Sequence, residues 1–393
     1  MSTFQTLDVD FTPVDSWFFR ESRPFDAIGT SQLGSVFPPP ASTVLGAFRN
    51  WVGRQLNVDW ATYKFKEQML TLPDGQQMSA WELIGGLAGH PGLICLDELG
   101  LMFNQERLYP LPMGLQQDME QRLYRLQDSE PVRCDLGFIR LPRAVTHPGV
   151  RTRAITNTWI TAEGLRTYLA GGIPAEHTLK PESELIVQEP HIGIALSRGR
   201  TIKEQMFYQT RHIRLHQGVS VFARFSGLPE ELINLLDGGS DHIRFGGEGR
   251  QAAIRCQRSD ADLPISECPK NRDFTMTLLT AASFRNGDQP DWLPADAKQC
   301  TAEDGSDYWQ VNIADTPVQI LSAVVGKTLR QGGWDMALGG PKPVTSLIPA
   351  GSTYFCQLPE DVQPRVLEQL QYQWVGHERN LGRGLICIGN INR

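Results

Sequence analysis

The first clear pattern in the chain is an alternation of apolar and polar residues in TLDVDFTPVDSWFFR, residues 6–20. Side chains two positions apart point to the same face of a strand. The spacing therefore predicts a strand at the start of this stretch, with Leu7, Val9 and Phe11 on one buried face. An aromatic cluster follows the predicted strand directly.

The pattern changes to a helical one in FPPPASTVLGAFRNWVGRQL, residues 37–56. The prolines interrupt any strand, and apolar residues then recur every three or four positions. Ser42 or Thr43 is expected to cap the helix, because a hydroxyl accepts a hydrogen bond from a free backbone N–H there. The apolar residues of this face are Val44, Ala47, Phe48 and Trp51.

Further along, residues 191–227 predict a strand, a turn, a short helix or loop, and then two strands. Residues 228–239 (LPEELINLLDGG) predict a helix that ends at glycine, and residues 242–258 predict two strands joined by a glycine turn. Residues 135–161 are interpreted as a loop. Residues 332–355 (GGWDMALGGPKPVTSLIPAGSTYF) predict a shaped loop that leads into a strand with Tyr354 or Phe355 buried.

Short alternating strands with occasional helices favour an α+β fold of antiparallel sheets over a doubly wound parallel one. A change of composition in AGGIPAEHTLKPESE, residues 170–184, predicts a domain junction. We therefore expect domains 1–182 and 183–393. The acidic, turn-rich stretch 286–307 is interpreted as an exposed insertion of the second domain.

The 393 residues carry a formal net charge of −7, so any nucleic-acid binding must use local basic patches. None of the seven cysteines forms a C-x-x-C pair, which argues against a zinc site. The N-terminus is acidic and lacks an apolar signal segment, and no apolar run is long enough for a membrane span. A cytoplasmic protein with free thiols is expected.

Motifs typical of catalysis are incomplete. VVGKT at 324–328 resembles the end of a P-loop, but Leu321 stands where that motif requires glycine. GGEGRQA at 246–252 precedes a strand-like pattern, so a dinucleotide site is rejected. His212 and His216 have helical spacing but lack the glutamate of a zinc protease. No catalytic residue, metal or cofactor is expected.

Arginines and lysines recur beside glycine turns and aromatic residues. Glycine lets a backbone amide approach a phosphate, cations supply charge, and aromatic rings stack on unpaired bases. This recurrence on an acidic chain indicates RNA binding. The residues of these clusters are Arg198, Lys203, Tyr208, Arg211, Arg244, Gly246, Gly247, Arg250, Trp334, Lys342, Arg379, Gly382, Arg383 and Gly384, with Arg140 and Arg143 in an earlier acid-free stretch.

An ordered set of segments resembles one family, the RAMP-superfamily subunit of type III-B CRISPR effector complexes that is the third protein of the Cmr module. The set covers nearly the whole chain, from residue 14 to residue 390. The matching segments are WFFRESRPF, VFPPPASTVLGAFRN, YPLP at 109–112, IRFGGEGR, GGWDMALGGPKP, IPAGSTYF and LGRGLICIG.

The resemblance implies two ferredoxin-like (RRM-like) domains with long Gly/Pro-rich loop insertions. It also implies a non-catalytic subunit that caps the 5′ repeat-derived tag of the CRISPR RNA. The implied partners are that RNA, the large polymerase-like subunit and the backbone RAMP subunit, with target RNA met indirectly. Matched residue by residue, the resemblance adds Arg20, Arg23, Ser42, Thr43 and Arg49 to the RNA-binding candidates.

Two rival functions stay open at this point. The first is a RAMP-type endoribonuclease that processes precursor CRISPR RNA, for which His212 or His216 is the available general base. The second is a pure protein scaffold whose basic clusters meet acidic surfaces of partner subunits.

Overall fold

In the computed structural model, residues 6–22, 31–87, 89–135, 137–196, 202–259, 263, 268–284, 292–336 and 339–391 are described. The chain forms two compact units, each built from three separate segments. Unit 1 comprises residues 1–105, 183–260 and 330–345, and unit 2 comprises residues 106–182, 261–329 and 346–393. The sequence-based division drew two contiguous domains, 1–182 and 183–393, and it shares with these units only the break at 182/183.

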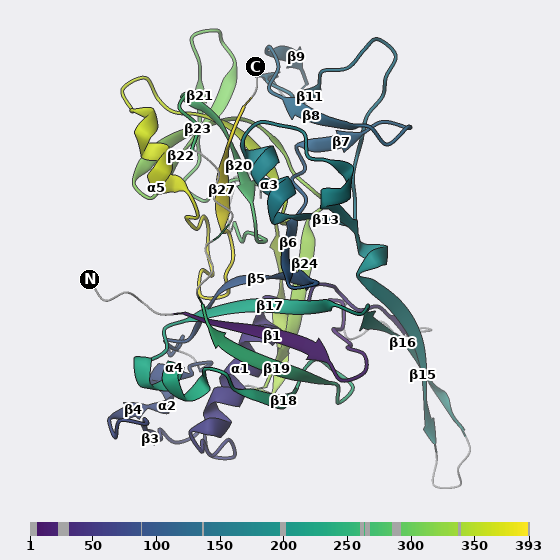
Figure 1. Ribbon diagram of the computed structural model, residues 1–393, viewed down its shortest axis with the longest axis vertical. Helices are drawn as coiled ribbons and strands as arrows, with labels where there is room; N and C mark the ends of the chain where they lie inside the picture. Colours follow the sequence, from purple (N-terminus) through teal and green to yellow (C-terminus); the bar gives the residue numbers. More distant parts are fainter. Residues whose placement is uncertain are drawn as a thin grey trace. The chain divides into compact units, whose positions relative to one another are not determined.

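Unit 1 is centred on an antiparallel sheet with strand order β5-β17-β1-β19-β18 (Figure 1). β1 pairs with both β17 and β19, which lie more than 200 residues further along the chain. This non-local pairing is the reason that a contiguous domain does not form. The strands are β1 (Leu7–Pro13), β5 (Cys95–Phe103), β17 (Val219–Ser226), β18 (Ser240–Arg244) and β19 (Gln251–Arg258).

One face of this sheet packs against helix α1. Leu7, Val9 and Phe11 are fully buried, as the alternation predicted. Phe48 of α1 stacks on Phe225 of β17 with ring centroids 3.8 Å apart. The helices of unit 1 are α1 (Ala41–Gln55), α2 (Ala80–Leu83) and α4 (Glu230–Leu236), and a small hairpin of β3 (Met69–Thr71) and β4 (Gln77–Ser79) precedes α2.

The opposite face carries a row of buried charges across three neighbouring strands. Arg224 of β17 pairs with Asp8 of β1 at 2.8 Å and lies 3.7 Å from Glu98 of β5. The three residues are direct cross-strand neighbours, so the register of the sheet places them together. The two faces of this sheet therefore differ in kind, one apolar and one ionic.

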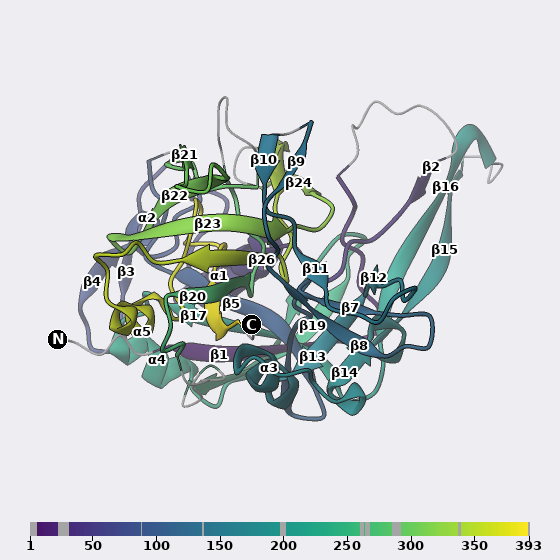
Figure 2. The same ribbon diagram turned by 90° about the horizontal axis from the view of Figure 1, so that it is seen from above.

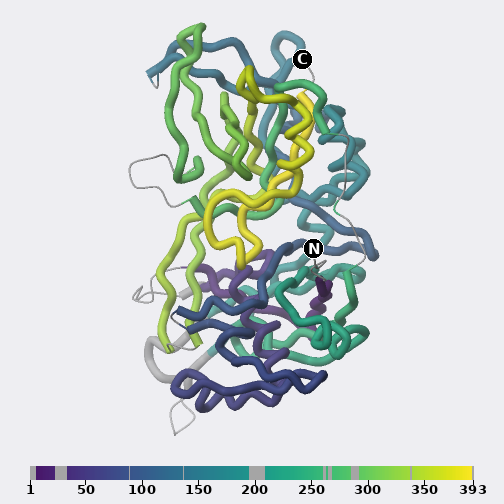
Figure 3. Tube along the Cα trace, turned by 90° about the vertical axis from the view of Figure 1, so that its left-hand side faces the viewer, coloured from purple at the N-terminus to yellow at the C-terminus, as the bar shows by residue number. Residues whose placement is uncertain are grey.

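A long hairpin extends from unit 1 beside this sheet (Figure 2). Its strands are β15 (Ile186–Leu196) and β16 (Ile202–Leu215), and β2 (Ser31–Leu33) pairs with β16 in parallel. The prediction of a short helix or loop in this region was wrong, because the cross-strand pairing of β15 with β16 determines its structure. A second hairpin, formed by β24 (Leu329–Asp335) and β25 (Gly340–Leu347), is called the ribbon below (Figure 3).

Unit 2 contains a six-stranded antiparallel sheet with the order β21-β22-β23-β26-β20-β27. Tyr354 and Phe355 are buried in β26, as predicted. The strands are β20 (Asp273–Leu278), β21 (Lys298–Thr301), β22 (Asp307–Ile313), β23 (Thr316–Val324), β26 (Thr353–Gln357) and β27 (Ile386–Asn390), with α5 (Leu367–Leu370) and the 3₁₀ turn Pro364–Val366 beside them.

The rest of unit 2 consists of short strands around α3 (Ala162–Leu169). β6 (Glu106–Pro110), β13 (Thr158–Thr161) and β14 (Leu179–Pro181) pair in that order, with 3₁₀ turns at Glu176–Thr178 and Glu182–Glu184. A four-stranded sheet contains β11 (Arg143–Ala144), β8 (Leu123–Gln127), β7 (Leu115–Gln117) and β12 (Arg153–Ala154), and β9 (Val132–Cys134) pairs with β10 (Gly137–Ile139).

Three other sequence interpretations need correction. Residues 135–161 contain β10 to β13 rather than a loop, and residues 332–347 lie largely in the ribbon. The described part of the acidic stretch 286–307 is not a free insertion, because β21 joins the six-stranded sheet. Long side chains and turn residues hide the alternation of such short strands. No helix in the described part of the chain is long and apolar enough to cross a membrane.

The Phe48–Phe225 contact generates a stability prediction. Phe48→Ala should lower the free energy of unfolding of unit 1 by about 3–5 kcal/mol, because it removes a fully buried ring and leaves a cavity. Chemical denaturation followed by tryptophan fluorescence measures this change. Phe65→Ala is the matched control, since the Phe65 side chain is 75% exposed, and it should change stability by no more than about 0.5 kcal/mol. Equal losses in both variants would contradict this view of the core.

Candidate nucleic-acid interface

Residues Asp15–Ser22, here called the junction segment, contact four distant parts of unit 1. Trp17 and Ile213 of β16 exchange backbone hydrogen bonds of 2.8 and 2.7 Å. The carbonyl of Phe18 accepts from Gly247 N–H at 2.8 Å. The hydroxyl of Ser22 accepts from Gly332 N–H of the ribbon at 2.5 Å. The segment therefore gathers the long hairpin, the glycine turn and the ribbon around one stretch of backbone.

The fourth contact is with residues 34–36, which follow β2. Glu21 N–H donates to the Gly34 carbonyl at 3.0 Å, and the Glu21 carboxylate accepts from Gly34 N–H at 2.9 Å. Phe19 N–H donates to the Ser35 hydroxyl at 3.0 Å. Arg20 forms an isolated bridge with Ser35, and its side chain is exposed.

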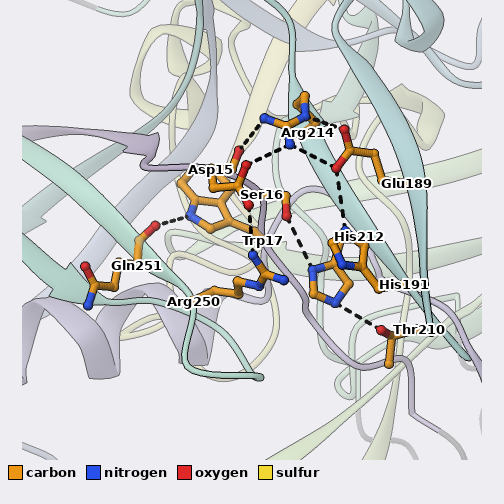
Figure 4. Close-up of polar contacts among 10 residues, drawn as sticks. All are labelled: Asp15, Ser16, Trp17, Glu189, His191, Thr210, His212, Arg214, Arg250 and Gln251. Carbon is orange, nitrogen blue, oxygen red and sulfur yellow. Dashed lines mark hydrogen bonds and ion pairs between the residues drawn. The ribbon is translucent and has the colours of Figure 1, made fainter. Parts of the chain in front are cut away.

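Asp15 lies between Arg214 of β16 and Arg250 of the turn that precedes β19 (Figure 4). Its carboxylate accepts from Arg214 Nη2 at 2.7 Å and from Arg250 Nη1 at 3.0 Å. Glu189 of β15 holds the other side of the Arg214 guanidinium, with an Nη2 to Oε2 distance of 3.0 Å. The hydrogen bond from Arg214 is the main reason that the pKa of Asp15 is lowered, so this carboxylate stays ionised.

His212 lies beneath this cluster in an aromatic stack. Its ring is 4.0 Å from the His191 ring and 5.2 Å from the Phe18 ring, measured between centroids. Its Nδ1 is 3.4 Å from the Ser16 hydroxyl, and its Nε2 is 3.0 Å from the Thr210 hydroxyl (Figure 4). Burial above all, and then the charges of His191 and Arg250, lower the pKa of His212 to about 4. At neutral pH it is an uncharged packing residue that is 1% exposed.

The glycine turn between β18 and β19 was predicted correctly as a strand-turn-strand unit. Phe245 N–H donates to the Arg250 carbonyl at 2.8 Å, which closes the turn. Gly246 has a φ of +87°, and a Cβ there would lie 2.6 Å from the Phe18 carbonyl oxygen. Gly247 similarly faces the Phe18 ring. Both glycines are therefore required by the close approach of the junction segment.

The ribbon presents two predicted residues to solvent. Trp334 is 51% exposed, and Lys342 is also exposed. Apolar side chains of Met336 and Val344 are exposed beside them. Trp334 is not part of a buried core, and about half of its surface is accessible to solvent.

Apart from the candidates on α1, the remaining predicted residues of unit 1 fall into three groups. Arg211 and Arg244 are exposed on β16 and β18. Lys203 and Tyr208 lie within β16, and Tyr208 pairs with Ser31 of β2. Arg23 and Arg198 lie outside the described residues.

The candidates on α1 have local structural contacts. Arg49 donates to the carbonyls of Pro91 and Ile94 at 2.7 and 2.6 Å, and burial lowers its pKa. Ser42 and Thr43 lie in the first turn, but the N-cap is Pro40 and no side-chain cap bond forms there. The predicted cap was wrong, because the first turn begins two residues earlier. No described contact joins these three residues to the junction segment.

The candidates in unit 2 lie apart from this cluster in the chain and differ in exposure. Arg140 pairs with Asp128 at 3.3 Å and with Asp304 at 2.7 Å. Arg383 is buried and pairs with Glu378. Gly384, with a φ of +79°, allows the backbone to approach the Val375 carbonyl, and Gly382 is buried next to Arg383. Arg143 and Arg379 are exposed.

Sequence reasoning missed Asp15, Glu189 and His191 as members of the cluster. Asp15 carried a usable signal, because it is a single acid between the predicted first strand and the aromatic run. Glu189 and His191 gave no such signal, because their place in the cluster depends on the register of β15 against β16 and on the bridge to Trp17. The described residues contain no group of three or more side chains suited to holding a metal ion.

Comparison with known proteins identifies the family. The family model described as CRISPR-associated protein (Cas_Cmr3) matches residues 9–391. The chain therefore belongs to the Cmr3 family of CRISPR-associated proteins. The resemblance found in the sequence is confirmed, and the chain is a Cmr3-type subunit of type III-B CRISPR effector complexes. No curated protein matches the chain in a sequence comparison.

Solved structures of related complexes are similar at low identity. A chain of the type III-B Cmr-beta complex bound to cognate target RNA and AMPPnP is 15% identical, with a TM-score of 0.48 over 92% of this chain and 88% of that one. A chain of the Csm3–Csm4 subcomplex of a type III-A interference complex is 12% identical, with a TM-score of 0.36 over 98% of this chain and 100% of that one. These likenesses add nothing to the family assignment.

The buried state of His212 generates a pH prediction. The unfolded chain binds this proton near pH 6.5 and the folded chain near pH 4, so protons favour the unfolded state between these values. Unfolding free energy should therefore be constant above pH 6.5 and fall as the pH decreases toward 4, by up to about 3 kcal/mol from this residue. Denaturation curves at several pH values measure the slope. His212→Gln should flatten it, and an identical slope in wild type and variant would contradict the assignment.

Proposed function

We propose that this subunit binds and caps the 5′ repeat-derived tag of the CRISPR RNA, and that unit 1 supplies much of the binding surface. The observation that carries the proposal is the junction segment, which brings its own Arg20 together with the glycine turn and the ribbon, from three parts of the chain. Cations and an exposed indole are groups that bind phosphates and unpaired bases.

Within the ribbon, Trp334 would stack on a base while Lys342 contacts a phosphate. An exposed tryptophan contributes little to the stability of a two-stranded hairpin, which is only marginally stable by itself. The exposed arginines Arg211 and Arg244 would add contacts to the phosphates of the RNA backbone. Because the chain is acidic overall, a few such contacts should carry the affinity, with a moderate dependence on salt.

The partners in this proposal are the large polymerase-like subunit, which this chain docks, and the backbone RAMP subunit that follows along the guide. Target RNA would be met only through its pairing with the guide. The ferredoxin-like assignment of both units belongs to the same proposal. Four antiparallel strands of each unit support it, in the spatial order β5-β17-β1-β19 in unit 1 and β23-β26-β20-β27 in unit 2. When the four strands of a unit are numbered by their position along the chain, both orders read 2-3-1-4, as in a ferredoxin-like sheet.

The role proposed here is non-catalytic. Both ring nitrogens of His212 contact hydroxyl groups and its side chain is buried, which makes it a poor general base for a solvent-borne RNA. His216 is exposed and is the remaining candidate for the rival endoribonuclease. Cleavage of precursor CRISPR RNA by the wild type, lost in His216→Ala, would replace the capping role with the enzymatic one.

The capping role is tested by purifying the protein with its genomic neighbours and mapping RNA crosslinks to peptides. Crosslinks from the 5′ tag to residues 15–22, 244–250 or 334–342 are expected. Guide RNA in the complex without crosslinks in this chain would favour the pure scaffold instead.

Trp334→Ala gives a quantitative prediction for the same role. Loss of one base–aromatic stack should weaken binding of tagged guide RNA by about 1–3 kcal/mol. Val344→Ala is the matched control, because it removes an apolar side chain of similar exposure from the same ribbon without removing a stacking surface. Filter binding or fluorescence anisotropy measures both variants, and equal affinity in wild type and Trp334→Ala would remove the ribbon from the interface.

A further inference from the structure

The pair of arginines that flank Asp15 forms an anion site that the chain fills with its own carboxylate. One carboxylate oxygen accepts from Arg214 and the other from Arg250, at 2.7 and 3.0 Å. The Asp15 side chain is 55% exposed, whereas those of Arg214 and Arg250 are 43% and 23% exposed. Asp15 is thus the most exposed side chain of the three.

Arg214 is held in place without the Asp15 carboxylate, whereas the only described ion pair of the Arg250 guanidinium is with Asp15. Glu189 binds Arg214 through Nε and Nη2, and the backbone carbonyl of Asp15 accepts from Arg214 Nη1 at 3.2 Å. Arg250 closes the glycine turn through its backbone. Its Nε is buried and has no hydrogen-bond partner among the described residues. Removal of the carboxylate would leave the Arg214 guanidinium oriented by Glu189 and would open the Arg250 guanidinium to another anion.

We propose that a phosphodiester group of the bound RNA replaces the Asp15 carboxylate between Arg214 and Arg250. Guanidinium groups bind phosphate and carboxylate through the same paired N–H donors, so one anion can exchange for the other. Asp15 is then an internal competitor that weakens binding of any RNA which does not also engage the rest of the surface. The inference rests on the proposed function and adds to it a phosphate subsite and a restraint on non-specific binding.

The neighbourhood favours a phosphodiester over a carboxylate of a partner protein. The junction segment that carries Asp15 also carries the exposed Arg20, and the strand that precedes the Arg250 turn ends in the exposed Arg244. A nucleic-acid backbone presents a charge at every nucleotide and can use such dispersed cations together. An acidic protein surface is the alternative outcome of the test below.

The experiment compares wild type with Asp15→Asn by fluorescence anisotropy over a range of salt concentrations. The full chain is used, with a single-stranded RNA that carries the 5′ repeat-derived sequence and with oligouridine as a non-specific probe. Asp15→Asn should bind both RNAs roughly three- to tenfold more tightly, with the larger gain for oligouridine. The slope of log affinity against log salt should become steeper by about 0.7 for each added phosphate contact.

Glu248→Gln is the matched control. Glu248 is exposed in the glycine turn and its replacement removes the same charge nearby, but it occupies no arginine pair. It should change affinity less than twofold. In an Arg214→Gln, Arg250→Gln background, Asp15→Asn should have no further effect, because the subsite is absent.

Equal or weaker RNA binding by folded Asp15→Asn would overturn the inference, as would equal gains in Asp15→Asn and Glu248→Gln. Tighter binding of a partner subunit without tighter RNA binding would also overturn it in favour of an acidic protein ligand. If Asp15→Asn does not fold, Arg214→Gln decides: the proposal requires weaker RNA binding and a shallower salt slope. Absence of RNA binding by wild type, alone and in the complex, would instead reject the proposed function itself.

Discussion

The pairing of β1 with β17 on one side and β19 on the other is the constraint on which the rest of unit 1 depends. It fixes the exit of β1 beside the turn that leads into β19, and the junction segment begins at that exit. From there the backbone bridge to β16 sets the position of the long hairpin. The residues proposed to bind RNA are thus positioned by sheet register rather than by helices, and a shift of one residue in β1 would disperse them.

Unit 1 contains two clusters of charged side chains, which differ in their burial. The Asp8–Arg224–Glu98 row is buried and satisfied within the sheet, so it supports the fold and is closed to ligands. The Asp15 cluster lies near the surface, where the Asp15 side chain is 55% exposed and another anion could take the place of its carboxylate. His212 beneath that cluster stays uncharged at physiological pH, so it adds no positive charge next to the two arginines.

The sequence supported the strongly periodic elements and the family, but it could not locate the site. β1, α1 and the β18–β19 unit follow from apolar spacing and glycine, and these were predicted. The ribbon and the strands of residues 137–161 were missed because prolines and arginines mask alternation in strands of only two to eight residues. Arg49 and Arg383 show why an arginine in the sequence is a weak predictor of RNA binding. Arg49 donates to two backbone carbonyls of the fold, and Arg383 pairs with the carboxylate of Glu378. The partners of Arg49 are 42 and 45 residues away in the sequence, and the five-residue spacing of Glu378 and Arg383 is no recognisable signature.

The division of each unit into three chain segments has a consequence for synthesis on the ribosome. The sheet of unit 1 cannot close until residue 258 has left the exit tunnel, and the ribbon follows only after residue 345. The nascent N-terminal strand must therefore wait, with its apolar face uncovered, while most of the polypeptide is translated. Chaperones or early-binding partner subunits would therefore have to protect the exposed strand during this period. For the same reason, neither unit can be obtained as a folded fragment by simple truncation.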